Sequence, residues 1–223
     1  MVKVHKITGS YGANAYLIDA THPILVDVGA ANMFDLLRRF LNPIDLEYIV
    51  LTHCHYDHTF GTAQLAEQTG ANIAIHEEDA KLLGDDWATV SDVFGARAPS
   101  IEPDMLLKGG ESFDLGNISL RVIHTPGHTL GSICLYGENI RSNLLFSGDT
   151  IFAAGGIGRT DLGGDAHALV NSIKLLTTLD VDTIYPGHGG ITNQNVDAQI
   201  RASLRYAELN CKAYNSKGFY AFV

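Results

Sequence analysis

The sequence predicts an α/β protein in which a mixed sheet, or a pair of sheets, is covered by helices. Two observations carry this expectation. The first 28 residues have the pattern of strands joined by tight turns, and the later residues alternate strand-like with helix-like runs. No internal repeat, low-complexity tract or linker interrupts the 223 residues, and 46% of them are hydrophobic, which is ample for a sizeable core. We therefore expect residues 1–223 to form a single domain.

In the N-terminal part, apolar runs bounded by turn residues predict strands over 2–8, 13–18 and 24–28. Asn32 is placed to cap a helix, because apolar residues recur at helical spacing from Met33 to Leu41. The next expected elements are a strand over 47–52, a histidine-rich segment and a helix over 59–68.

The middle of the chain is less regular. Residues 72–75 predict a short strand, and residues 76–83 a short helix that begins at His76, which we expect to be solvated. Residues 84–104 contain prolines and scattered aromatic residues without a period. A loop of this length is typical of a flap over a functional site, although a surface excursion with its aromatic residues on the core would have the same pattern.

The remaining elements are predicted more clearly. A hairpin over 113–123 turns at Gly116-Asn117, and strands over 132–136 and 143–146 follow. Asp165 is placed to cap a helix whose apolar residues extend to Leu176. A last strand covers 183–185, a last helix 196–207, and an aromatic tail on the surface 210–223.

A dense group of metal-type ligands follows the strand expected over 47–52. His53, His55, Asp57 and His58 form the pattern H-x-H-x-D-H. If the strand continues into this group, alternation begins to place His53 and His55 on one side, about 6.5 Å apart along the chain, where two imidazoles can meet at one ion. Asp57 and His58 fall where strand becomes helix and aim elsewhere, which suits a second ion.

An isolated histidine is more often structural than a ligand, so none of these residues alone would indicate much. Desolvating several imidazoles and a carboxylate at one strand end is costly unless a cation compensates them. The group as a whole therefore predicts a metal site.

Charge and composition exclude some classes of partner. The formal net charge is −10 at pH 7 and no basic stripe is visible, which argues against binding to nucleic acid. No apolar run reaches the length of about 18 residues that a membrane span needs, and the N-terminus lacks the apolar segment of a secretory signal. We expect a cytoplasmic protein that acts on a small molecule, with no membrane partner and with its oligomeric state left open.

The three cysteines do not suggest a disulfide framework, because their number is odd and no C-x-x-C spacing occurs. Cys54 lies between His53 and His55, but strand alternation turns it to the opposite side. We expect it to be a small buried residue.

Three further ligand candidates follow strand-like runs, in turns rich in glycine or proline. They are His128 in T-P-G-H-T, Asp149 in S-G-D-T and His188 in P-G-H-G. Strand ends hold side chains rigidly, and glycine-rich turns let several backbones approach one point, so we expect these residues to converge with the first group. Asp149 has an oxygen for each of two ions and can bridge them.

The other histidines are expected not to bind metal. His124 ends a predicted strand four residues before His128, and a structural role or a contact behind a ligand suits it better. His5, His22 and His167 have no partner nearby in the sequence.

Taken together, H-x-H-x-D-H with its T-P-G-H-T, S-G-D-T and P-G-H-G contexts resembles the metallo-beta-lactamase-fold hydrolases. The resemblance covers about residues 2–192 and includes all seven expected ligand positions. It implies a four-layer αββα sandwich of two mixed sheets with helices outside, and a site at the open edge between the sheets.

The resemblance also implies how the seven ligands are shared between two divalent ions. His53, His55 and His128 resemble the ligands of the first metal, Asp57, His58 and His188 those of the second, and Asp149 the bridge. Imidazole and carboxylate donors without thiolate fit zinc, our first expectation, and also iron or manganese.

Within the superfamily, the segment from Phe146 to Phe152 and the G-G-I-G-R-T-D run after it look most like the glyoxalase II branch, the hydroxyacylglutathione hydrolases. Arg159 matches a position where those enzymes carry a basic residue that touches glutathione. Those enzymes usually add a C-terminal helical domain, and we expect this chain to end too early to contain it. We therefore expect hydrolysis of acyl thioesters with an open choice of thiol carrier.

Other branches differ at named positions. The beta-lactamases of this fold commonly have cysteine at the position of Asp149, and the flavodiiron proteins have glutamate at that of His55. Persulfide dioxygenases share the H-x-H-x-D-H pattern but use one iron held by counterparts of His53, His128 and Asp149, and they are the alternative to a hydrolase. A lactonase of the same fold is a second alternative, and a non-catalytic binding protein a third.

The expected chemistry follows from two adjacent ions. A water bridging them ionises near neutral pH, a drop of roughly 8 pKa units from bulk water, or about 11 kcal/mol. Such a pair of ions would supply a hydroxide to attack the thioester carbonyl, polarise the carbonyl oxygen and stabilise the leaving thiolate. Asp57 is expected to orient the hydroxide. No separate general acid is needed, because a thiolate leaves without protonation.

Overall fold

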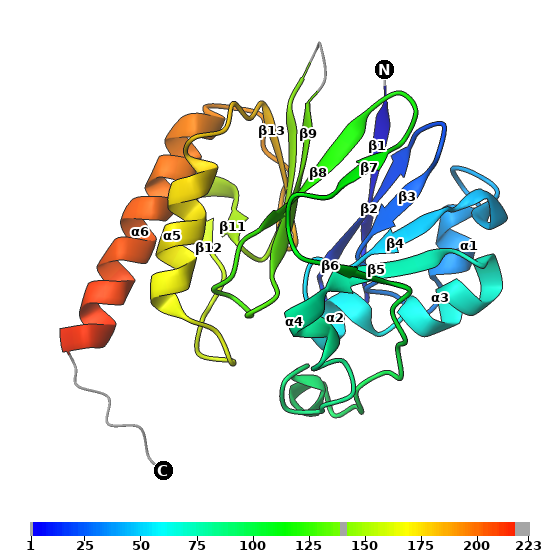
Figure 1. Cartoon of the computed structure of the whole chain (residues 1–223), viewed down its shortest axis with the longest axis horizontal. Coiled ribbons are helices and arrows are strands. Elements are labelled where there is room, and N and C mark those ends of the chain that lie inside the picture. The colour runs from blue at the N-terminus through cyan, green and yellow to red at the C-terminus, as the bar shows by residue number, and fades with distance from the viewer. Residues whose placement is uncertain (1, 139–141, 217–223) are drawn as a thin grey trace.

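The computed structural model describes residues 2–138 and 142–216, the last four by their backbone alone. Its strands form two sheets and a short ribbon (Figure 1). The six-stranded sheet contains, in spatial order, β1 (Lys3–Thr8), β2 (Asn14–Asp19), β3 (Ile24–Val26), β4 (Tyr48–Val50), β5 (Asn72–His76) and β6 (Met105–Leu107). The five-stranded sheet contains β13 (Thr183–Pro186), β10 (Leu144–Gly148), β9 (Ile133–Glu138), β8 (Ser119–His124) and β7 (Ser112–Asp114). The ribbon pairs β11 (Ile151–Phe152) with β12 (Gly156–Ile157).

Both sheets are mixed. In the larger sheet β1, β2 and β3 are antiparallel, whereas β3, β4, β5 and β6 run parallel. In the smaller sheet β10 and β13 are parallel and the other pairs antiparallel. The helices are α1 (Met33–Leu37), α2 (Tyr56–Thr59), α3 (Thr62–Thr69), α4 (Glu77–Ala80), α5 (Ala166–Leu176) and α6 (Val196–Ser216), with short 3-10 turns η1 (Pro43–Asp45), η2 (Ser91–Phe94) and η3 (Ala153–Gly155).

Three apolar clusters hold these elements in four layers. Strand alternation divides β2, for example, because Leu17 packs with residues of α1 and α3 while Tyr16 and Ile18 face the other sheet. The outer face of the smaller sheet is also covered by helices, since Leu145 packs with Ile173 of α5. Figure 1 shows α1 and α3 on one side, α5 and α6 on the other, and the two sheets between them. The fold is therefore the αββα sandwich of two mixed sheets that the sequence predicted.

Several element boundaries differ from the sequence prediction. The helix expected over 59–68 is divided into α2 and α3, and α2 begins at Tyr56, so Asp57 and His58 already lie in a helical turn. The helix begun at Met33 has regular α geometry only to Leu37, and Asn32 makes no side-chain capping bond. β6 was not predicted, because its three residues carry no readable period.

The C-terminal helix is longer than expected. α6 continues to Ser216, so residues 210–216, expected to belong to an aromatic tail, are helical. Residues 217–223 of that predicted tail lie outside the described residues.

His76 opens α4 as predicted, but the expectation that it is solvated was wrong. Its side chain accepts a hydrogen bond from the Glu78 N–H at 3.2 Å, as a helix cap does. The residue is only 3% exposed, and its ring stacks on that of His124 with centroids 3.9 Å apart. The aromatic stack between two sheet ends explains the burial of a residue that the local sequence places at an exposed helix start.

Within residues 2–138 and 142–216, none of the helices combines the length and apolarity needed to cross a bilayer. Cys54, Cys134 and Cys211 are all buried and free, as the cysteine count predicted. The Cys54 thiol points to the Ala88 carbonyl, at 3.7 Å, and not into the ligand group.

Candidate metal centre

All seven predicted ligands lie at one end of the two sheets, in segments that follow strands. The loop after β4 carries His53 and His55, and α2 carries Asp57 and His58. His128 lies between β8 and β9, Asp149 directly after β10, and His188 two residues after β13. Residues as distant as 58 and 188 thereby come within 3.2 Å of each other.

The sequence suggested that strand alternation brings His53 and His55 together, but the structure shows a different cause. β4 ends at Val50, and both histidines lie in the irregular loop beyond it. His55 is the residue that precedes α2, with extended φ and ψ of −62° and 145°. This conformation turns its ring back towards His53, and the two ring centroids are 4.8 Å apart.

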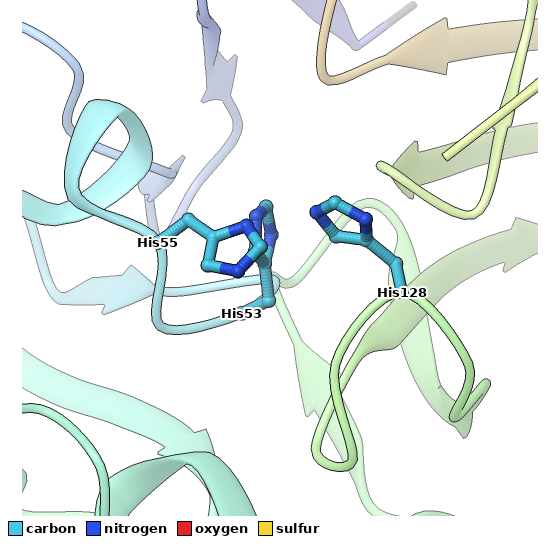
Figure 2. A group of neighbouring side chains, drawn as sticks. All are labelled: His53, His55 and His128. Atoms are coloured by element: carbon cyan, nitrogen blue, oxygen red, sulfur yellow. The ribbon is translucent and has the colours of Figure 1, made fainter. Parts of the chain in front are cut away.

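Three imidazoles form the first donor group. Figure 2 shows His53, His55 and His128 with their rings turned toward one another. One nitrogen of each lies within 4.8 Å of those of the other two. The Nε2 atoms of all three are buried and make no hydrogen bond within the described chain. Buried nitrogens without a partner are costly, so this arrangement fits a bound cation.

The opposite nitrogens of two of these rings are held by the protein. His128 donates its Nδ1–H to the Arg159 carbonyl at 2.7 Å. The Nδ1 of His53 lies 3.0 Å from the Thr52 hydroxyl. A contact at Nδ1 fixes the ring and leaves the Nε2 lone pair free for a metal.

Asp57, His58 and His188 form a second donor group with the same maximum separation of 4.8 Å. The Nε2 of His188 lies 3.2 Å from the Asp57 Oδ2 and 3.2 Å from the His58 Nε2. Two ring nitrogens and a carboxylate oxygen that converge in this way offer three donors to one ion.

Asp149 lies between the two groups. Its Oδ1 is 3.4 Å from the Nε2 of His58, and its Oδ2 is 3.6 Å from the Nε2 of His128. Oδ1 is buried without a hydrogen bond inside the described residues. A carboxylate in this place can contact an ion in each group.

The pKa shifts of the histidines differ between the two donor groups. Burial, together with the nearby His58 and His128, lowers the pKa of His53 well below its ordinary value. The same causes, burial first, lower the pKa of His55 to about 3. Both rings are therefore neutral at physiological pH and present a lone pair.

In the second group, carboxylates surround the histidines. Burial opposes protonation of His58, but the carboxylates of Asp149, Asp27 and Asp57 outweigh it and raise the pKa of His58 to about 10. Burial would raise the pKa of Asp57, yet His58 and His188 lower it to about 2. A cation bound here would therefore take the place of a proton.

Two buried carboxylates that the sequence did not single out support the ligand loops. Asp27, directly after β3, accepts hydrogen bonds from His58 Nδ1 at 2.9 Å and from the N–H and hydroxyl of Thr52 at 2.7 and 2.8 Å. The one available signal was its position, since it follows the apolar run 24–26 as the ligands follow theirs.

Asp79 connects the loop of His53 to the loop of His128. It accepts hydrogen bonds from the N–H of Cys54 at 2.8 Å, the hydroxyl of Thr129 at 2.7 Å and the N–H of Gly131 at 2.6 Å. No sequence signal distinguished it from its acidic neighbours Glu77 and Glu78.

The histidines set aside by the sequence lie apart from the donor groups. His124 bonds through Nε2 to the Leu130 carbonyl at 2.9 Å and so braces the loop that carries His128. His22 contacts Glu47 at 2.7 Å, and His5 stacks on Phe40. His167 lies 3.3 Å from the Cys211 thiol, between α5 and α6.

A cavity of about 530 Å³ opens over the two groups. Asp57, Asp149 and three of the histidines form its floor, and Arg159 lies at its wall. Val90, Val93 and Phe94, from the segment expected to form a flap, also line it. The clustered histidines and aspartates at its floor are able to bind metal ions, next to a space for a small molecule.

Comparison with known proteins identifies the family of the chain. Residues 8–188 match the family model described as metallo-beta-lactamase superfamily. A protein of Methanocaldococcus jannaschii named probable metallo-hydrolase MJ0888 is 38% identical over 214 residues, 92% of this chain and 98% of that protein. The hydroxyacylglutathione hydrolase of Francisella tularensis subsp. novicida is 34% identical over 174 residues, 77% of this chain and 60% of that protein.

Two solved structures extend the comparison. BLEG-1, titled a B3 metallo-beta-lactamase, has a TM-score of 0.76 and 30% identity, covering 88% of this chain and 95% of that one. TTHA1623, solved in a di-iron-bound form, has a TM-score of 0.73 and 28% identity, covering 87% and 96%. The matched family model, the similar relatives and the shared fold agree, and the chain belongs to the metallo-beta-lactamase superfamily.

Proposed function

We propose that this chain is a binuclear metal-dependent hydrolase of acyl thioesters. The observation that carries the proposal is the pair of adjacent donor groups with Asp149 between them. Its broader part, a metal-dependent hydrolase, is supported by the family and by the relatives named probable metallo-hydrolase. The thioester part is supported by the relative named hydroxyacylglutathione hydrolase.

His53, His55 and His128 would hold one ion, Asp57, His58 and His188 the second, and Asp149 would contact both. Zinc is the metal we propose for imidazole and carboxylate donors, and iron and manganese fit the same set. The neighbour TTHA1623 is described with two irons, which supports two adjacent ions without deciding between metals. Ions so placed lower the pKa of water to near neutrality and polarise a carbonyl oxygen.

The chain's own side chains position the reactants. Asp57 lines the cavity, and its pKa of about 2 keeps the carboxylate ionised, so it can accept a hydrogen bond from the attacking water and orient it. The Asp27 carboxylate accepts a hydrogen bond from the Nδ1–H of His58, and the Arg159 carbonyl accepts one from the Nδ1–H of His128. Both rings therefore keep Nε2 directed to the site. A thiolate leaves without a proton, and no further acid is required.

We also propose that the whole chain acts as one domain in the cytoplasm. Three apolar clusters connect both sheets with both helix layers, and the metal ligands come from both sheets, so neither half contains a complete site. Arg159 lines the cavity, and its guanidinium is the proposed contact for the substrate.

Metal content and substrate scope together test the proposal. Protein purified without chelator should contain about two metal ions per chain and should release free thiol from S-lactoylglutathione or a simpler acyl thioester under nitrogen. It should consume no oxygen when given glutathione persulfide. Persulfide-dependent oxygen uptake that tracks a single iron, without anaerobic thioester cleavage, would establish the dioxygenase instead. Cleavage confined to lactones or β-lactams would refute the thioester assignment.

A further inference from the structure

The walls of the cavity carry information about the substrate that the metal ligands do not. Its floor is polar, whereas Val90, Val93 and Phe94 form one wall and Phe152, Ile157 and Leu162 contribute to the other. A ligand that reaches the floor must place its remaining atoms between two apolar surfaces.

The wall of residues 90–94 is built into the fold. Val90 is buried and has a φ of 53°, a conformation that β-branched residues rarely adopt. The ring of Phe94 packs against Tyr56 and Tyr11, with centroids 5.6 and 4.8 Å away. The Tyr56 N–H donates to the Thr89 carbonyl at 2.8 Å. An uncommon backbone conformation held in this way indicates that the position of the wall matters to the site.

Side-chain hydrogen bonds close the same segment into a compact loop. Asp86 accepts from the Ala98 N–H at 2.7 Å and from the guanidinium of Arg97 at 2.6 Å. Asp85 accepts from the N–H groups of Trp87 and Ala88, both at 2.9 Å. These hydrogen bonds hold the segment that carries the apolar wall.

Among the described residues that line the cavity, Arg159 is the one with a permanent positive charge. Its guanidinium is already paired. Nε contacts Asp161 Oδ1 at 2.7 Å, and Nη2 contacts Asp161 Oδ2 at 2.6 Å, a bidentate geometry. Asp161 occupies two of the five N–H donors of the guanidinium, and its negative charge repels a second carboxylate that approaches the other three. The pair has a net charge close to zero, so an anionic substrate gains little from Arg159.

We propose that the site selects neutral thioesters with apolar substituents, and that Asp161 determines this selectivity by neutralising Arg159. The inference rests on the proposed function and specifies its substrate class. The substrate places an uncharged alkyl or aryl part between the two apolar walls, with its carbonyl at the floor. Asp161 acts through Arg159 and does not touch the substrate.

Binding of uncleavable thioethers tests the charge preference separately from the chemistry. S-butyl-N-acetylcysteamine is neutral, and S-butylglutathione carries the same alkyl group on an anionic carrier. Calorimetry with the metal-loaded protein should give a Kd about tenfold lower for the neutral ligand. Thioester hydrolysis, measured on the same preparation, decides the proposed function and leaves the binding result independent.

Substitutions test whether Asp161 determines the preference for a neutral ligand. Asp161→Asn removes the charge that neutralises Arg159, and should strengthen binding of S-butylglutathione about three- to tenfold relative to the neutral ligand. Arg159→Ala should change the ratio of the two Kd values little, and the double variant should return the ratio to that of Arg159→Ala. Val93→Thr keeps the side-chain volume and should weaken the S-butyl ligand more than an S-methyl one.

The inference would be overturned if the native protein bound S-butylglutathione more tightly and Arg159→Ala abolished that preference. An unchanged ratio in Asp161→Asn would equally exclude Asp161 as the determinant. A Val93→Thr variant that binds the S-butyl and S-methyl ligands with unchanged affinity would contradict the role of the apolar wall.

Discussion

Replacement of Asp27 by asparagine should weaken metal binding by changing the tautomer of His58. The carboxylate accepts from the backbone N–H of Thr52 at Oδ1, and from the Thr52 hydroxyl and His58 Nδ1 at Oδ2. The backbone N–H cannot rotate or exchange roles, so the oxygen of the introduced amide would remain opposite it. The amide NH2 would then face His58 Nδ1, which must become an acceptor and leave its proton on Nε2.

The expected magnitude follows from one hydrogen bond. To offer its Nε2 lone pair to an ion, His58 would have to return the proton to Nδ1, opposite another donor, and lose a charge-assisted hydrogen bond worth about 1.5–3 kcal/mol. At about 1.4 kcal/mol for each factor of ten, this is roughly a 10- to 100-fold loss of affinity for the second ion. The free energy of unfolding of the metal-free chain should also fall, because the protonated His58 ring of the metal-free site loses its buried carboxylate partner. Position 27 has a φ of 61°, which asparagine tolerates.

The assay combines calorimetric titration of chelator-treated protein with Zn²⁺ and nitrogen NMR of the histidine rings. The weaker of the two binding steps should be affected, and His58 should carry its proton on Nε2. Asp79→Asn is the matched control, since Asp79 is an equally buried carboxylate with three hydrogen bonds and none to a histidine.

The control should separate a loss of stability from a loss of metal affinity. Backbone N–H groups occupy both oxygens of Asp79, so an amide leaves one of them facing NH2 and should cost about 1–3 kcal/mol of unfolding free energy, while the affinity of the second ion is largely kept. The reasoning would be refuted if Asp27→Asn bound two ions as tightly as the native protein with the His58 proton on Nδ1.

Further predictions concern the bridge, the protons and the backbone of the site. Asp149→Asn should lose activity by several orders of magnitude and His124→Ala much less, because Asp149, unlike His124, lies between the two donor groups; steady-state rates with metal content on the same samples decide this, and comparable losses would contradict it. The pKa of His58, raised to about 10, means that its proton is present at neutral pH and is displaced by the ion, so affinity should rise with pH from neutrality towards that pKa. Titrations in buffers of different ionisation enthalpy should reveal the released proton, and buffer-independent heats would count against it. Gly187→Ala places a Cβ against Asp149 Oδ1, closer than van der Waals contact allows, and should reduce the metal content, whereas Gly190→Ala, with open space around it, should not; equal metal content in the two variants would show that the loop accommodates the methyl group.

The sequence determined the order of the main strands and helices, because the period of apolar residues is a local property of the chain. It also determined the chemistry of the candidate ligands, since imidazoles and carboxylates after strand ends indicate metal binding whatever their final geometry. The structure brings those seven residues together. Their assignment to two metals stays a prediction that metal analysis tests.

Tertiary structure decided how the ligands are aimed and supported. His53 and His55 meet because the loop after Val50 turns, whereas strand alternation was the local expectation. Asp27 supports Thr52 across 25 positions, and Asp79 reaches Gly131 across 52. A carboxylate whose partners are so distant leaves no period or motif in its own neighbourhood.

The sequence predicted the position of Arg159 but not its charge environment, because that environment depends on contacts made in the folded chain. The match of Arg159 to a basic position of the glyoxalase II branch predicted a cation near the substrate, and Arg159 does line the cavity. Its pairing with Asp161 depends on the path of the backbone between them, and the apolar walls depend on segments that β12 and η2 bring to the same opening. Residue types are fixed by the sequence, but the charge and shape that a substrate meets are set by contacts that only the folded chain makes.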